Sequence, residues 1–193
     1  MWLLYDSQAD VLYAVDPSQQ SYTKMDRAMA QQLGGVLDAV QEQMKNLPPE
    51  QRAAIEQMMG RSMGKSQVKT EYVLTSSKRK HAGVECTVGH LVRSNKARHE
   101  FCVAQPKALG MSSKDYAVMS KMFELMAALR DSAGGMFSQD MPDPSQMNGV
   151  AIESNGPKGG HQILSKVSHD PIAADQFKIP TNYRQEVIPN LTP

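Results

Sequence analysis

The sequence has almost no net charge and no long apolar run, and each shortage excludes a class of protein. Its 21 basic and 20 acidic residues leave a formal charge of +1, too little to hold a nucleic acid or an anionic membrane surface. No stretch approaches the roughly 20 apolar residues that a membrane helix needs. The apolar start of the chain breaks at Asp6 and lacks a charged flank, so it is neither a signal peptide nor an anchor. We therefore expect no nucleic-acid partner and no transmembrane segment.

The spacings typical of enzymes and metal sites are also missing. The sequence has no Cys-x-x-Cys, His-Glu-x-x-His, calcium-loop or Gly-x-Ser-x-Gly motif. The glycine-rich segment 156–160 lies in a predicted hairpin turn, which does not resemble a phosphate-binding loop. The basic run 78–81 is interpreted as a solvated turn, with a functional anion contact as the alternative. No metal-ligand spacing connects the histidines His81, His90, His99, His161 and His169. We expect no catalytic residue, no metal ion and no cofactor.

Methionine is the residue in excess. The chain has 14 methionines but only 4 phenylalanines and 1 tryptophan. Because methionine is unbranched and flexible, we expect an adaptable core or groove. The thioethers near residues 58–63 and 119–126 could also bind Cu(I), but plain apolar helix faces explain them better.

Periodicity divides the first part of the chain into strands followed by helices. Residues 2–5 and 11–15 are short apolar runs between polar turns, which predicts a β-meander. From Asp26, which can cap a first turn, apolar residues recur at helical spacing up to Leu47. Two prolines then end this helix and start a second one over 50–59. The two helices are expected to form a hairpin.

The remainder alternates strands with one more helix. Residues 68–74, 84–92 and 97–104 have the composition of strands, with predicted turns over 76–83 and 93–95. Ser112 and Asp115 form a possible capping box at the start of a third helix. A loop over 134–149, a hairpin of 150–154 with 161–168, and an extended tail from His169 complete the prediction.

The two cysteines are expected to face each other across the hairpin of 84–92 and 97–104. If the turn is centred on Ser94, residues equally far from Ser94 are opposite each other, which pairs Cys86 with Cys102. Opposed β-carbons at a non-hydrogen-bonded position lie within disulfide range. The bridge would stabilise the fold by roughly 3 kcal/mol and would need an oxidising compartment. We therefore predict a disulfide and a periplasmic or secreted location, with two reduced cysteines as the alternative.

The same register constrains what else the hairpin can do. It places Val88 opposite Glu100, so the cysteine face is not purely apolar. Cys86 and His90 share this face, but roughly 13 Å separates residues four positions apart on a strand, which is too far for a nucleophile and its base.

Several short segments in a fixed order resemble the bacterial domain-of-unknown-function family 4412, whose extracytoplasmic members look like lipoprotein-sorting carriers. The segments are Tyr22-Thr-Lys-Met25, Leu47-Pro-Pro-Glu-Gln-Arg52, Gly83-Val-Glu-Cys86, Phe101-Cys-Val-Ala104, Leu109-Gly110 and Phe177-Lys-Ile-Pro180. The resemblance implies a curved antiparallel sheet, an incomplete β-barrel, whose concave face is covered by about three Met-rich helices. It also implies an export signal and several strands before Trp2. The family has no assigned activity and so lends no catalytic residues.

We thus predict an α+β fold in a single domain over 1–193, lacking N-terminal strands of a longer precursor. The expected function is an extracytoplasmic, non-catalytic binding or carrier domain for an apolar ligand such as a lipid or acyl chain. The residues expected to line the site are Met29, Leu33, Met58, Met119, Met122, Phe123 and Met126. One alternative is that these residues simply fill the core. Another is a structural or interaction domain of the cell envelope that forms a homodimer through an exposed strand edge near its N-terminus.

Overall fold

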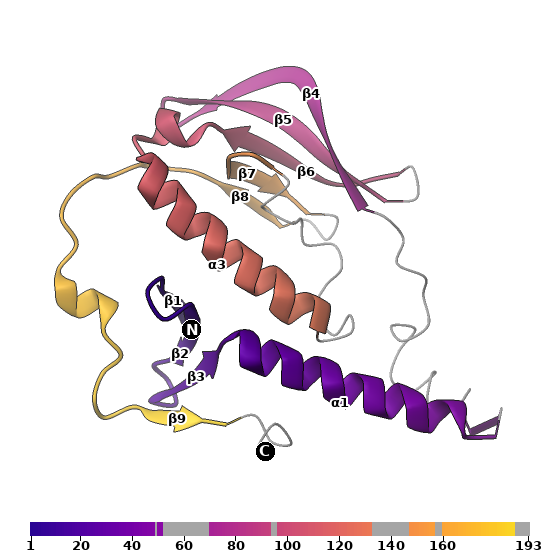
Figure 1. The fold of residues 1–193 in the computed structure, drawn as a ribbon. Helices are drawn as coiled ribbons and strands as arrows, with labels where there is room; N and C mark the ends of the chain where they lie inside the picture. The colour runs from indigo at the N-terminus through magenta and orange to yellow at the C-terminus, as the bar shows by residue number, and fades with distance from the viewer. Residues whose placement is uncertain (49, 52–69, 94–95, 133–146, 157–159, 188–193) are drawn as a thin grey trace. The chain divides into compact units, whose positions relative to one another are not determined.

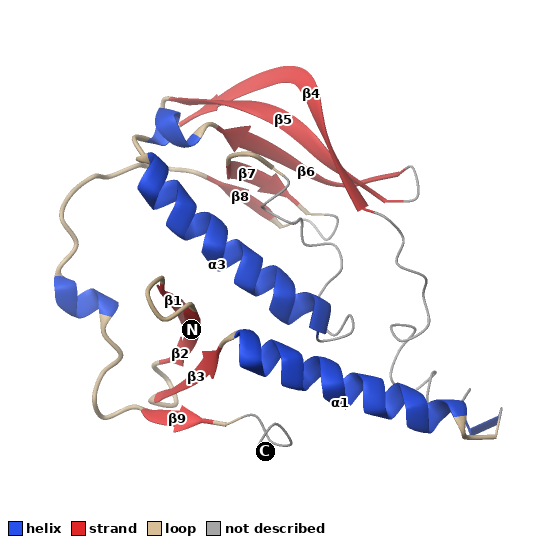
Figure 2. Ribbon diagram, in the orientation of Figure 1, coloured by secondary structure: helices blue, strands red, loops and turns tan. Residues whose placement is uncertain are grey.

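The computed structural model describes residues 1–48, 50–51, 70–93, 96–132, 147–156 and 160–187 (Figure 1). The fold is α+β, as predicted, with two separate sheets and helices between the strand segments (Figure 2). The chain divides into two compact units. The first comprises 1–65, 124–137 and 171–193, and the second comprises 66–123 and 138–170.

The first unit contains a four-stranded sheet. Its strands are β1 (Trp2–Asp6), β2 (Val11–Asp16), β3 (Ser21–Met25) and β9 (Arg184–Glu186), in the order β1-β2-β3-β9. The first three strands form the predicted antiparallel meander, and β9 pairs in parallel with β3. Asp6 and Asp16 shape the two turns, because their carboxylates accept backbone N–H groups two residues further on. The tail from His169 was predicted to be extended, and its residues Arg184–Glu186 form strand β9 of this sheet.

Helix α1 (Arg27–Lys45) follows β3 and begins where the sequence predicts. The Asp26 carboxylate caps it by accepting the Met29 N–H at 2.9 Å. Ala30 is buried, whereas Val36, which lies on the predicted apolar face, is 44% exposed. The helix passes Gly34 without interruption, and a Cβ there would lie 4.0 Å from the Ser132 Cβ.

Helix α3 (Ser113–Ser132) crosses the boundary between the units, with residues up to Phe123 in the second unit and the rest in the first. Its capping box is confirmed: the Asp115 N–H donates to Ser112 Oγ, and the Ser112 N–H donates to the Asp115 carboxylate, both at 3.1 Å. Leu125 and Leu129 are its buried residues. Among the described helices, none is long and apolar enough to cross a membrane.

The second unit contains a five-stranded sheet in which neighbouring strands are antiparallel. Its strands are β4 (Thr70–His81), β5 (Val84–Arg93), β6 (Lys96–Ala104), β7 (Val150–Asn155) and β8 (His161–Ile163), in this order. A short 3-10 helix, η1 (Pro106–Leu109), follows β6, and another, η3 (Ala174–Phe177), lies in the tail of the first unit.

Two predicted boundaries in this sheet are wrong. The predicted turn over 76–83 is mostly strand, because β4 continues to His81 and the chain reverses at Ala82 and Gly83. Both residues have positive φ (47° and 82°), the backbone that a two-residue hairpin turn requires. The last predicted strand, 161–168, is also too long, since β8 ends at Ile163.

The two faces of this sheet carry separate apolar clusters. The cysteine face holds Val84, Cys86, Val88, Cys102, Ala104, Leu109 and Ile152. The opposite face holds Leu91, Phe101, Val103 and Met147, with Tyr72 packed against them. Tyr72 lies over Gly89, where an added Cβ would approach the Tyr72 hydroxyl oxygen to 2.2 Å. Burial raises the pKa of Tyr72 to about 12.

Some predictions fall on residues that the structure does not describe. Of the second helix, predicted over 50–59, only Glu50 and Gln51 are described, and both are helical. The predicted loop over 134–149 is described only from Met147 onward, and Met58 lies outside the described residues.

Candidate functional site

The Cys86–Cys102 disulfide is present, as predicted, and joins β5 to β6. The Cα atoms of the two cysteines are 5.4 Å apart, within the normal range for a disulfide. Their exposed fractions are 2% and 0%, so the bridge belongs to the core of the second unit.

The predicted register of this hairpin is wrong by two residues. Cys102 is opposite Val88 rather than Cys86, and Glu100 is opposite His90 rather than Val88. One residue of the shift arises because Arg93 pairs directly with Lys96. The other arises from a β-bulge, because Leu91 pairs with His99 while Val92 pairs with Ala97. The bridge therefore joins diagonal neighbours on one face, whose Cα atoms approach to 5.4 Å in this hairpin.

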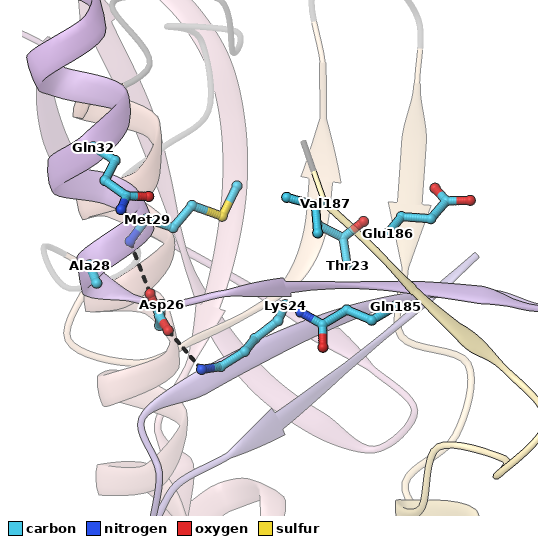
Figure 3. Close-up of a pocket in the computed structure, with 9 residues that line it drawn as sticks. All are labelled: Thr23, Lys24, Asp26, Ala28, Met29, Gln32, Gln185, Glu186 and Val187. Carbon is cyan, nitrogen blue, oxygen red and sulfur yellow. Dashed lines mark hydrogen bonds and ion pairs between the residues drawn. The ribbon is translucent and has the colours of Figure 1, made fainter. Parts of the chain in front are cut away.

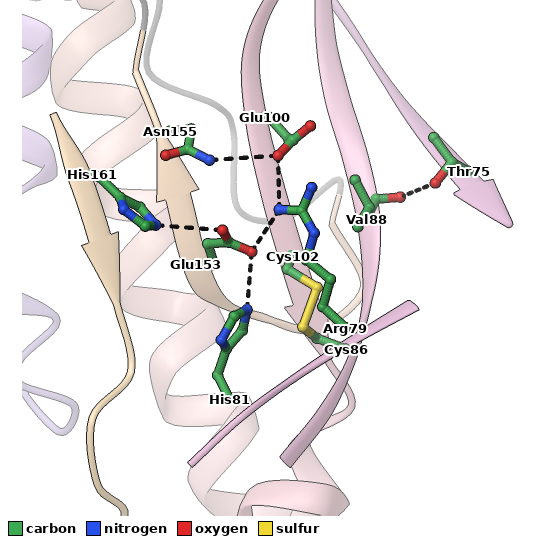
Figure 4. Close-up of polar contacts among 10 residues, drawn as sticks. All are labelled: Thr75, Arg79, His81, Cys86, Val88, Glu100, Cys102, Glu153, Asn155 and His161. Atoms are coloured by element: carbon green, nitrogen blue, oxygen red, sulfur yellow. Dashed lines mark hydrogen bonds and ion pairs between the residues drawn. A yellow bond between two sulfur atoms is a disulfide. The ribbon is translucent and has the colours of Figure 1, made fainter. Parts of the chain in front are cut away.

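A cluster of charged and polar side chains lies on the same sheet face as the disulfide (Figure 4). We call it the Glu153 cluster. It consists of Arg79 and His81 from β4, Glu100 from β6, Glu153 and Asn155 from β7, and His161 from β8. Side chains from four strands thus meet around one carboxylate.

Glu153 is the centre of this cluster. Arg79 Nη1 donates to Glu153 Oε2 and to Glu100 Oε1, both at 2.8 Å. His81 Nε2 lies 3.0 Å from Glu153 Oε2, and His161 Nε2 lies 3.4 Å from Glu153 Oε1. The exposed side-chain fraction rises outward from 7% for Glu153 to 15% for His81 and 53% for His161. A buried carboxylate is therefore surrounded by nitrogen donors.

The electrostatics of the cluster favour the ionised form of Glu153. Burial alone would raise the pKa of Glu153, because a carboxylate loses hydration in the core. The hydrogen bonds and charges of Arg79 and His81 outweigh this effect and hold the pKa below its ordinary value. The same contacts raise the pKa of Arg79, with the bond to Glu153 as the largest cause.

These properties are those of a structural ion-pair network. A general base that works near neutral pH needs a raised carboxylate pKa, whereas that of Glu153 is lowered. The Arg79 guanidinium already supplies a positive charge at Glu153 Oε2. Within the described ranges, no group of three or more His, Cys, Asp or Glu side chains is arranged to hold a metal ion.

The residues predicted to line an apolar site lie on two helices. Met29 and Leu33 are neighbours on α1, and the other four described residues, Met119, Met122, Phe123 and Met126, lie on α3. All six are partly buried.

The α3 residues of this set share one face of the helix. At 3.6 residues per turn, positions 119, 122, 123 and 126 form a stripe, and the buried pair Leu125 and Leu129 lies roughly 100° around the helix from it. Helix α3 therefore buries a leucine face and leaves the adjacent methionine and phenylalanine face only partly covered.

A small cavity of the first unit lies between β3, the start of α1 and β9, and has a volume of about 250 Å³. Figure 3 shows its lining, which includes Met29 and Val187 but also the Lys24–Asp26 ion pair at 3.0 Å. The backbone hydrogen bond from Met29 lowers the pKa of Asp26, and Lys24 adds to this effect. The mixed lining, and a volume below the roughly 300 Å³ of common ligand pockets, do not match the apolar site that the sequence predicts.

The Glu153 cluster escaped the sequence-based interpretation. The run 78–81 was interpreted as a solvated turn, but its alternation places Arg79 and His81 on the disulfide face and separates them from Lys78, which pairs with Glu85 at 2.8 Å. A recognisable signal was the charged Glu153 directly after the apolar residues Val150, Ala151 and Ile152 of strand β7.

The chain matches no family model, and no curated protein or solved structure is significantly similar to it. The candidate site therefore rests on the geometry of this chain.

Proposed function

We propose that the protein is an extracytoplasmic, non-catalytic binding or carrier domain for an apolar ligand such as a lipid or acyl chain. The observation that carries this proposal is the partly covered face of α3 formed by Met119, Met122, Phe123 and Met126. Flexible thioethers adapt to irregular alkyl chains. The neighbouring buried residues Leu125 and Leu129 make the surroundings of this face apolar. The disulfide supports a location outside the reducing cytoplasm.

The resemblance to the domain-of-unknown-function family 4412 belongs to the same proposal. We infer membership from the order of the matching segments. In this view the five-stranded sheet corresponds to the curved, carrier-like sheet of that family, with Met-rich helices over its concave face.

The ligand proposal is tested by expressing the full chain in the periplasm and analysing the purified protein by native mass spectrometry. We expect adducts with lipid masses that disappear after organic extraction. Fluorescence of cis-parinaric acid then gives the affinity of the extracted protein for a fatty acid. The proposal is wrong if neither lipid adducts nor saturable fluorescence enhancement is observed.

A pair of variants on α3 localises the site. Met119→Glu places a charge on the methionine face and should weaken parinaric acid binding by at least about tenfold, because burying an uncompensated carboxylate is costly. Ala117→Glu places the same charge on the exposed, opposite side of the helix and should leave binding unchanged. Equal effects of the two variants would contradict a site on the methionine face.

A second candidate function is an envelope interaction domain that forms a homodimer through β1. The observation that favours it is the position of β1 at the edge of its sheet, with Leu3 47% exposed. An edge strand presents backbone groups to a second strand. Light scattering after size exclusion should then show a dimer that Leu3→Lys converts to a monomer, and a monomer at all concentrations would rule this function out.

A further inference from the structure

The Arg79–Glu153 ion pair runs along the Cys86–Cys102 disulfide. Arg79 is directly opposite Cys86 in the β4–β5 pairing, and Glu153 is directly opposite Cys102 in the β6–β7 pairing. Opposed residues of antiparallel strands project from the same face. The Arg79 side chain therefore begins beside one cysteine and ends at the carboxylate beside the other, and Figure 4 shows it extending past the bridge.

The disulfide has two kinds of neighbour on this face. The apolar neighbours comprise buried residues, such as Leu109 and Ile152, and partly buried ones, such as Met111. The polar neighbour Arg79 has an exposed side-chain fraction of 38%. The guanidinium is held in place beside the bridge by its bonds to Glu153 and Glu100, so it stands on one approach from solvent to the sulfur atoms.

We propose that Arg79 and Glu153 form a cover that controls the access of thiols to the Cys86–Cys102 disulfide. While the ion pair is intact, an external thiolate cannot reach either sulfur atom. When the pair breaks, the side chain of Arg79 swings into solvent and exposes the bridge without unfolding of the sheet.

The reaction under control is thiol–disulfide exchange with a dithiol reductant. Its thiolate attacks one sulfur, forms a mixed disulfide and expels the other cysteine as a thiolate. The second thiol of the reductant then displaces the remaining cysteine, so the reductant leaves as a cyclic disulfide and the two cysteine thiolates each take up a proton. Two electrons pass from the reductant to the bridge.

The experiment measures the rate of reduction of the folded, full-length chain by dithiothreitol at constant pH. Free thiols are trapped with iodoacetamide at intervals and counted by intact mass. We expect Arg79→Ala to accelerate reduction by at least about tenfold, because it removes charge-assisted hydrogen bonds that oppose local opening. Glu153→Gln, which keeps the size of the side chain, should accelerate it in the same direction.

Two controls separate local opening from general destabilisation. Lys78→Ala removes the neighbouring ion pair on the other face and should leave the reduction rate within about twofold. Leu91→Ala weakens the apolar cluster of the other face without touching the cover. The rate of disulfide reduction in Leu91→Ala should rise only by the amount that its measured loss of unfolding free energy predicts.

The proposal is overturned if Arg79→Ala and Glu153→Gln are reduced at the rate of the unaltered chain. It is also overturned if the reduction rates of all variants, Leu91→Ala included, depend on global unfolding free energy alone. The proposal is supported if Arg79→Ala and Glu153→Gln are reduced faster than their loss of unfolding free energy predicts from the other variants.

Discussion

Removing the disulfide should destabilise the second unit by an amount that the loop length fixes. Cys86 and Cys102 are 16 residues apart in sequence, and the chain-entropy relation gives about 3 kcal/mol for a loop of this size. Both cysteines are buried, so replacing them with alanine also deletes packed sulfur atoms and adds a cavity cost. The double variant Cys86→Ala/Cys102→Ala should therefore lose at least about 3 kcal/mol of unfolding free energy.

Urea denaturation followed by circular dichroism measures this loss. The oxidised chain, the fully reduced chain and the double alanine variant are compared at the same pH. The oxidised and reduced chains differ only in the S–S bond and the two thiol hydrogens, so their difference reports the loop-closure effect. The difference between the reduced chain and the alanine variant reports the packing of sulfur. If the oxidised and reduced chains had the same midpoint and the same slope, the loop-closure reasoning would be refuted.

Two further predictions concern the two faces of the five-stranded sheet. Because the pKa of Glu153 is lowered on folding, its ionised form stabilises the fold above the unfolded-state pKa, and this stabilisation is lost as the pH falls through the folded-state pKa. Glu153→Gln should thus cost about 2 kcal/mol at pH 7 and progressively less below about pH 4, as measured by urea midpoints across pH; a cost independent of pH would contradict this. On the other face, Gly89→Ala should cost about 1–3 kcal/mol by overpacking, since the new Cβ would meet Tyr72. Adding Tyr72→Ala should remove most of that penalty, and a thermal melt in which the two losses simply add would show that no clash exists.

The sequence was sufficient to place those elements whose signals are local. The Asp26 cap and the Ser112–Asp115 capping box lie within one helical turn of the residues they satisfy, and both helices begin where these signals predict. The α+β class follows from the same local periodicity. The cysteine pairing was also accessible, because both residues lie in one hairpin.

The register was not accessible, because the bulge between Leu91 and Val92 carries no glycine or proline signal. A disulfide tolerates this error, since a bridge can join either directly opposed or diagonal residues on one face. A correct prediction of the bond therefore did not require a correct prediction of its neighbours. The residues that lie beside the bridge, Arg79 and Glu153, come from β4 and β7, and the β5–β6 register does not determine how these outer strands pair.

The length of β4 and the burial of Glu153 depend on each other. A buried carboxylate is costly unless a cation reaches it, and the guanidinium that bonds Glu153 comes from a residue 74 positions earlier in the chain. Arg79 reaches Glu153 only because residues 78–81 continue as strand up to a turn of two residues. If this run were the solvated loop that its composition indicates, Glu153 would lack its main partner. The polar end of β4 is thus held in the sheet by a contact between residues far apart in sequence. Local composition contains no sign of that contact, so it predicted a turn for residues 78–81.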